Sequence, residues 1–103
     1  MTVAAQDDNG NYIPAFGLGT VQTVAYTGTA GAISNAVGSS TRMVRVWCST
    51  DAHILIAASP TADTNDTPVT GKAAEYFKVR GGIDKVSAVQ QSAGGDLYVT
   101  ELE

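Results

Sequence analysis

The chain predicts an all-β fold, a single-domain antiparallel β-sandwich or small barrel of about seven short strands. Its 103 residues are the length of one domain. β-Branched residues dominate the apolar set, with 11 valines and 5 isoleucines against 4 leucines, and there are 12 threonines besides. Such side chains fit a pleated sheet better than a helix. Eleven glycines interrupt the chain, and we find no long window with a convincing helical period of apolar residues.

Alternation of apolar and polar side chains marks the best strand, residues 42–49. It places Val44, Val46 and Cys48 on one face and residues such as Trp47 on the other. Residues 53–58 are nearly all apolar, as expected of a strand covered on both sides. The full set of expected strands is 20–26, 32–37, 42–49, 53–58, 75–80, 83–90 and 97–102.

The connections between these strands predict antiparallel hairpins. Short turns that contain glycine, serine or aspartate lie at residues 49–52, 81–82 and 92–95. The segment 59–71 holds two prolines and predicts a long loop, which in a compact domain is typically functional or mobile.

The first 19 residues do not fit the sandwich, which we expect to span residues 20–103. They are polar and glycine-rich, and Pro14 excludes a central strand position. The dipeptide at 9–10 is Asn-Gly, a tight-turn sequence, so residues 1–19 form either a small hairpin or an extended N-terminal arm.

Composition argues against several functional classes. The net charge of −4 argues against nucleic-acid binding, which depends on neutralising phosphates. No apolar run reaches the length of a membrane span, and the first eight residues do not resemble a signal peptide. One cysteine, Cys48, and one histidine, His53, leave little catalytic chemistry. We therefore expect a protein that is not an enzyme and needs no cofactor.

Cys48 and His53 are the one pair with the residue types of a nucleophile and its base. A four-residue loop would place them opposite each other across a hairpin. A three-residue loop would instead pair Cys48 with Ala52 and His53 with Trp47, and we favour this register because it buries a consistent apolar face.

No metal site is expected. Residues 7–11 and 63–66 superficially resemble calcium loops, but they lack the alternating oxygen ligands and final glutamate of an EF-hand.

Trp47, Tyr76 and Tyr98 fall on the faces opposite the apolar stripes. Aromatic side chains on a sheet can anchor a protein interface or stack on sugar rings. Alternatively, this second face is itself packed, for instance under the N-terminal segment.

The C-terminal part of the chain carries a family resemblance over residues 42–102. Its characteristic stretches are CSTDAHILI at 48–56, SPTA at 59–62, AEYFKV at 74–79, GGIDKVSAV at 81–89 and GDLYVTEL at 95–102. This series resembles small accessory virion proteins of tailed bacteriophages. The resemblance implies a jelly-roll-like β-sandwich that decorates or cements the capsid, or forms part of a fibre or tail, with no active site.

From this resemblance we expect the major capsid protein as the partner, with neighbouring coat subunits bridged by a homodimer or homotrimer. The protein would be made in the host bacterial cytoplasm and reside on the capsid surface. The alternative is a head-fibre or tail component that binds host-surface glycans. The candidate interface residues are Tyr12, Ile13, Phe16 and Leu18 in the arm, and Trp47, Tyr76 and Tyr98 on the sandwich.

Overall fold

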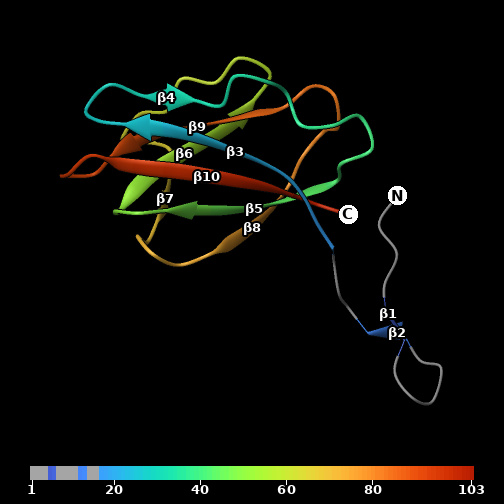
Figure 1. Ribbon diagram of the computed structural model, residues 1–103. Coiled ribbons are helices and arrows are strands. Elements are labelled where there is room, and N and C mark those ends of the chain that lie inside the picture. The colour runs from blue at the N-terminus through green and yellow to red at the C-terminus, as the bar shows by residue number, and fades with distance from the viewer. Residues whose placement is uncertain (1–4, 7–11, 14–16) are drawn as a thin grey trace.

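The computed structural model describes residues 5–6, 12–13 and 17–103. Eight strands form two four-stranded sheets, and a further pair of two-residue strands precedes them (Figure 1). The strands are β1 (Ala5–Gln6), β2 (Tyr12–Ile13), β3 (Leu18–Tyr26), β4 (Gly31–Ala32), β5 (Met43–Cys48), β6 (Ala52–Ala57), β7 (Thr67–Val69), β8 (Glu75–Lys78), β9 (Lys85–Gln90) and β10 (Gly95–Leu102).

The order of the strands is that of a jelly roll. The first sheet has the order β3-β10-β5-β8 and the second sheet has the order β4-β9-β6-β7, and every neighbouring pair is antiparallel. Successive strands of the chain alternate between the two sheets, except that β6 and β7 share one. The predicted all-β sandwich of jelly-roll type is therefore confirmed.

The predicted hairpins are wrong. The turns at 49–52, 81–82 and 92–95 each connect strands of different sheets. None of the pairs β5–β6, β8–β9 and β9–β10 is therefore a hairpin. In sequence, a short turn rich in glycine, serine and aspartate looks the same whether it reverses the chain within a sheet or carries it to the facing one.

The largest differences from the predicted strands concern β7 and β4, and the other predicted strands agree with the structure to within two residues at each end. The expected loop at 59–71 contains β7, whose central residue is Pro68. Proline is tolerated there because β7 lies at the edge of the second sheet. The strand expected at 32–37 is reduced to β4, although backbone hydrogen bonds from Ile33 to Val86 and from Val37 to Asp84 continue its course beside β9.

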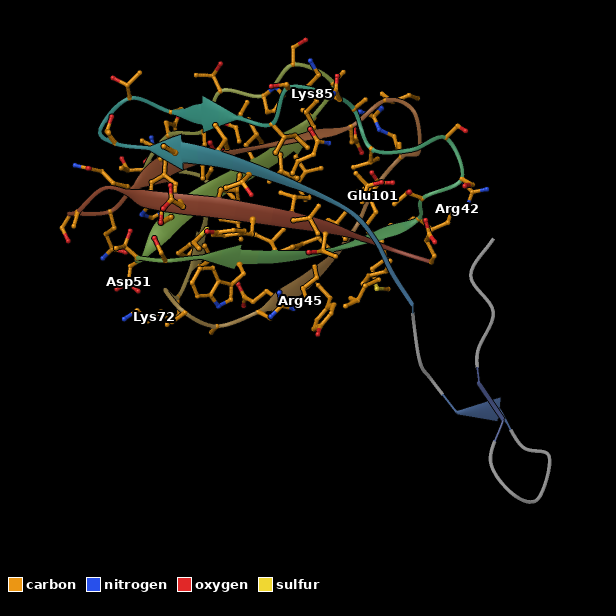
Figure 2. All side chains as sticks on the ribbon, in the orientation of Figure 1. Arg42, Arg45, Asp51, Lys72, Lys85 and Glu101 are labelled. Carbon is orange, nitrogen blue, oxygen red and sulfur yellow. The ribbon has the colours of Figure 1, made fainter. Side chains whose placement is uncertain are left out.

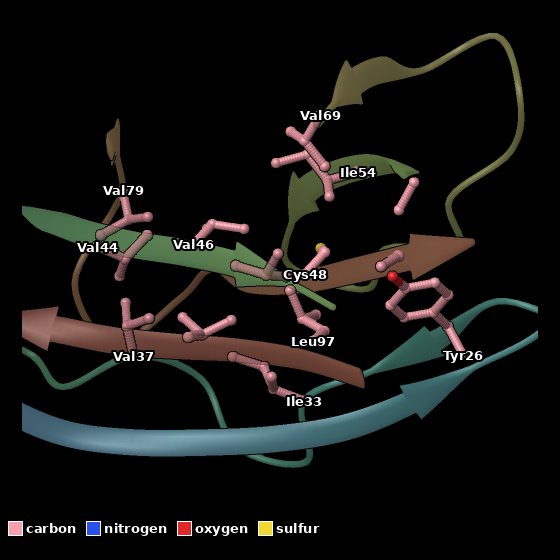
Figure 3. Packing of buried hydrophobic residues seen from close by; sticks show 14 residues of the cluster. Tyr26, Ile33, Val37, Val44, Val46, Cys48, Ile54, Val69, Val79 and Leu97 are labelled. Atoms are coloured by element: carbon pink, nitrogen blue, oxygen red, sulfur yellow. The ribbon is translucent and has the colours of Figure 1, made fainter. Parts of the chain in front are cut away.

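The hydrophobic core fills the space between the two sheets (Figure 3). Alternate residues of β5 point into it, since Val44, Val46 and Cys48 are almost completely buried. From the second sheet, Ile54 and Ala52 meet them. The remaining members of the buried cluster are Tyr26, Ile33, Val37, Val69, Val79, Val86, Ala88, Leu97 and Val99.

A long connection covers part of the outer face of the second sheet. Ser87 and Val89 alternate with the core residues of β9 and so point away from the core, yet both are buried. The backbone N–H of Ala62 donates a hydrogen bond to the Ser87 hydroxyl at 3.0 Å, and Ala62 is itself buried. The connection between β6 and β7 thus covers the β9 part of this face, whereas the outward side chains of β6, His53 and Leu55, stay partly exposed.

Candidate functional site: the outer face of the first sheet

The outer face of the first sheet is built from matching positions of its four strands. One row crosses the whole sheet, because Thr100 on β10 pairs with Val21 on β3 and with Arg45 on β5, and Arg45 pairs with Tyr76 on β8. These residues alternate with the buried ones of the same strands, so their side chains point away from the core.

A second row brings two aromatic rings together. Tyr98 pairs with Trp47 across β10 and β5, and Thr23 pairs with Tyr98 from the other side. The ring centroids of Trp47 and Tyr98 are 5.4 Å apart with an interplanar angle of 69°. This edge-to-face contact is a favourable aromatic geometry, so each ring helps to hold the other in position.

This face exposes apolar side chains to a degree that the second sheet does not. Val21, Tyr76 and Tyr98 are 53%, 58% and 37% exposed. Five large hydrophobic residues are exposed in the described part of the chain, and four of them belong to strands of the first sheet. A clustered apolar surface of this kind is typical of a binding face.

A shallow, open hollow of about 320 Å³ lies in this surface. Val21, Arg45, Trp47, Tyr98 and Thr100 line it. Figure 2 shows Arg45 projecting outward from β5. The hollow therefore combines flat aromatic surface, aliphatic surface and one guanidinium group, which suits a flat or apolar group that carries an acceptor oxygen.

The predicted interface residues fall into two groups. The structure brings Trp47, Tyr76 and Tyr98 onto this one face. Leu18 begins β3 at the end of the same sheet and is highly exposed.

The remaining predicted residues belong to the N-terminal segment. Tyr12 and Ile13 form β2, whose backbone pairs antiparallel with β1. Phe16 lies outside the described residues. Within the part of the chain that the structure describes, β1 and β2 pair with each other and with no strand of the sandwich.

The sequence-based prediction missed three residues of the hollow, namely Val21, Arg45 and Thr100. Arg45 had a detectable signal, since the alternation of residues 42–49 already places it on the same face as Trp47. Val21 and Thr100 had none, because only the pairing of β3 with β10 brings these distant positions together.

The pair Cys48 and His53 is not assembled. Cys48 on β5 pairs with Leu97 in the first sheet, whereas His53 on β6 pairs with Val89 and Pro68 in the second. Both registers considered for a β5–β6 hairpin are therefore wrong. Burial raises the pKa of the Cys48 thiol to about 11, so the thiolate that a nucleophile requires is disfavoured.

A second hollow, of about 380 Å³, opens at the edge of the sandwich. Ile54, Ile56 and Phe77 supply its apolar wall. The polar residues Asn65, Asp66 and Thr67 form part of its rim. Ile56 and Phe77 also pack against the core cluster, so this hollow is an opening into the core between β6 and β8.

Among the residues that the structure describes, no cluster of three or more histidine, cysteine, aspartate or glutamate side chains could hold a metal ion. In that same part of the chain, no helix has the length and hydropathy needed to cross a membrane.

Comparison of the chain with protein-family models, with curated proteins and with solved structures finds no match. Function is therefore inferred from the outer face of the first sheet and from the sequence resemblance.

Proposed function

We propose that this protein is a structural component of the virion of a tailed bacteriophage, and that it decorates or cements the capsid by bridging neighbouring coat subunits. The outer face of the first sheet is the surface that binds the coat. The observation that carries the proposal is the asymmetry of the sandwich. The β6–β7 connection covers part of one outer face, while the other outer face exposes the large apolar side chains of Val21, Tyr76 and Tyr98. The sequence resemblance supplies the identity of the partner.

The chemistry of this face is suited to binding a protein lattice. Tryptophan, tyrosine and arginine are the residue types that dominate the energetics of protein interfaces, and Trp47, Tyr98 and Arg45 line one hollow. The face is wide and shallow and carries few charges. Such a face fits a partner whose surface is already formed and repeats, as in a lattice of coat subunits.

The N-terminal segment provides a second contact with the coat in the proposed function. The predicted arm of residues 1–19 is shortened by the structure, because Leu18 already pairs with Leu102 in the first sheet. The unpaired edge of a coat sheet accepts a strand from residues 1–16, as in β-strand addition. Deletion of these residues is expected to weaken attachment and to leave the sandwich folded, because β3 begins only at Leu18. An unfolded truncated protein would show instead that the segment belongs to the core.

The direct test is co-sedimentation with expanded, DNA-free capsid shells of the virus that encodes the protein, prepared without it. We expect saturable binding at a fixed ratio to the coat subunit and no binding to soluble coat monomers. Absence of binding to competent shells would overturn the proposal. Sedimentation velocity of the free protein tests the expected dimer or trimer, and a monomer would remove symmetric self-association from the proposal.

A second candidate function is binding of host-surface glycans by a head-fibre or tail component. The observation that favours it is the hollow beside Trp47 and Tyr98, since aromatic rings next to an arginine can stack on a sugar and hold its oxygens. This function predicts sugar-dependent quenching of Trp47 fluorescence. No response across a broad glycan panel would exclude it.

A further inference from the structure

Arg45 occupies the centre of the outer face of the first sheet. It pairs across the strands with Thr100 on one side and with Tyr76 on the other, and Trp47 follows two residues later on the same face. Arg45 is half-buried. Among the described residues, Arg80 and Asp84 form the only ion pair. No described carboxylate therefore forms an ion pair with Arg45.

The outer face of the first sheet carries more basic than acidic residues, whereas the whole chain carries more acidic than basic ones. The chain carries 10 acidic and 6 basic residues. On the outer face of the first sheet, the strand positions that carry a charge are Arg45, Lys78 and Asp96. Asp96 lies four residues along β10 from Thr100, which is about 13 Å at the rise of a β-strand. The hollow itself is therefore cationic within an acidic protein.

From this charge distribution we infer that the hollow binds a coat-protein segment that presents an aspartate or glutamate carboxylate beside an apolar or aromatic side chain. The inference rests on the proposed function and names the chemistry of its partner. The carboxylate accepts hydrogen bonds from the Arg45 guanidinium, whose planar fork fits both carboxylate oxygens. The neighbouring side chain packs on Trp47, Tyr98 and Val21, which line the same hollow.

The charge pattern disfavours a second copy of this chain as the occupant. A symmetric contact centred on the hollow would bring two copies of Arg45 together, while Lys78 and Asp96 lie at opposite ends of the face. Juxtaposed like charges cost free energy when an interface excludes water. A partner that supplies a carboxylate satisfies Arg45 instead.

The test compares single substitutions in co-sedimentation with the coat shells. Arg45→Gln removes the guanidinium from the hollow, and Arg42→Gln is the matched control because it removes the same group from an exposed position at the end of the sandwich (Figure 2). Arg45→Lys keeps the charge and removes the planar fork. Thermal unfolding of each variant establishes that the fold is retained.

We expect Arg45→Gln to weaken binding about ten-fold or more, the consequence of losing a charge-assisted hydrogen bond. Arg42→Gln should stay within about two-fold of the unsubstituted protein, as surface substitutions do. Arg45→Lys should fall between the two. Added NaCl should weaken binding of the unsubstituted protein more steeply than that of Arg45→Gln.

The outcomes separate this inference from the function on which it rests. If the unsubstituted protein does not bind shells, the proposed function fails. If it binds, and Arg45→Gln binds with the same affinity and salt dependence, the inference is overturned while the proposed function stands. If shells are not bound but the polyuronate alginate is bound in an Arg45-dependent manner, the occupant is an acidic sugar and both proposals are overturned.

Discussion

The hydroxyl of Tyr26 donates a hydrogen bond to the backbone carbonyl of Thr50 at 2.8 Å and accepts one from the backbone N–H of Thr50 at 3.2 Å. Tyr26 ends β3, whereas Thr50 lies in the turn that carries the chain from the first sheet to the second. The Thr50 hydroxyl continues the network to the carbonyl of Ala93 in the β9–β10 turn, at 3.0 Å. A single buried phenol thus joins the crossing turns at one end of the sandwich.

Replacement of Tyr26 by phenylalanine tests this junction. The substitution removes the hydroxyl and keeps the buried ring, so the free energy of unfolding should fall by about 1 kcal/mol, the net contribution of such hydrogen bonds. Urea denaturation measures the change. Tyr76→Phe is the control, because Tyr76 is exposed on β8, and it should change stability by less than about 0.5 kcal/mol. Equal effects of the two substitutions would show that the hydrogen bonds of the Tyr26 hydroxyl add nothing to the free energy of unfolding.

Acid sensitivity is expected at the turn between β8 and β9. The side chain of Arg80 donates to the buried Asp84 carboxylate at 2.8 and 3.1 Å, and this contact holds the pKa of Asp84 below its ordinary value of 3.8. Since the pKa is lower in the folded state, the ionised carboxylate stabilises the fold above pH 3.8. That contribution is lost as the pH falls through the lowered pKa.

Asp84→Asn should therefore be less stable than the unsubstituted protein at pH 7 and should lose less stability on further acidification. Urea unfolding across a pH series from about 7 to about 3 measures both effects. Asp96→Asn, at an exposed position, should keep the pH dependence of the unsubstituted chain. The same slope in Asp84→Asn as in the unsubstituted protein would contradict the assignment to Asp84.

Thiol labelling tests the burial of Cys48. The pKa of this thiol rises from 9.0 to about 11 on burial, which lowers its thiolate fraction at pH 8 by about 100-fold. We expect a maleimide or disulfide reagent to react at least that much more slowly with the folded protein than with the urea-unfolded protein. Equal rates would place Cys48 at the surface and restore it as a candidate nucleophile.

A pair of glycine substitutions tests how closely the β7–β8 connection packs on the β5–β6 turn. A Cβ atom at Gly71 would lie 2.7 Å from the carbonyl carbon of Thr50 and 2.9 Å from the backbone nitrogen of Asp51. Gly71→Ala should therefore lower the free energy of unfolding by about 1–3 kcal/mol, as overpacking does. A Cβ atom at Gly28 would meet only the flexible side chain of Gln90, at 3.6 Å, so Gly28→Ala should be nearly neutral. Thermal unfolding of the two variants measures the difference. A neutral Gly71→Ala would mean that the connection is free to move away.

Side-chain alternation within one strand could be predicted well from the sequence. The pattern of residues 42–49 correctly placed Val44, Val46 and Cys48 in the core, because β5 is covered on one face only. The same pattern contains Trp47 and Arg45 on the opposite face, so part of the candidate site was visible before any pairing was known.

Pairing between strands could not be predicted in the same way. Cys48 pairs with Leu97, which is distant in the chain, and not with the residues that immediately follow it. Turn chemistry constrains only the few residues of the turn, whereas the choice of sheet depends on which distant strands bury their apolar faces together. The row from Val21 to Thr100 to Arg45 follows from this long-range pairing, and so does the hollow that these residues line.

An electron cryomicroscopy map of shells saturated with the protein would show whether the exposed outer face of the first sheet binds the coat lattice. We expect Trp47, Tyr98 and Arg45 to face the coat surface, with a coat carboxylate against Arg45. A map in which the second sheet contacts the shell, and the Trp47 face is open to solvent, would contradict this expectation.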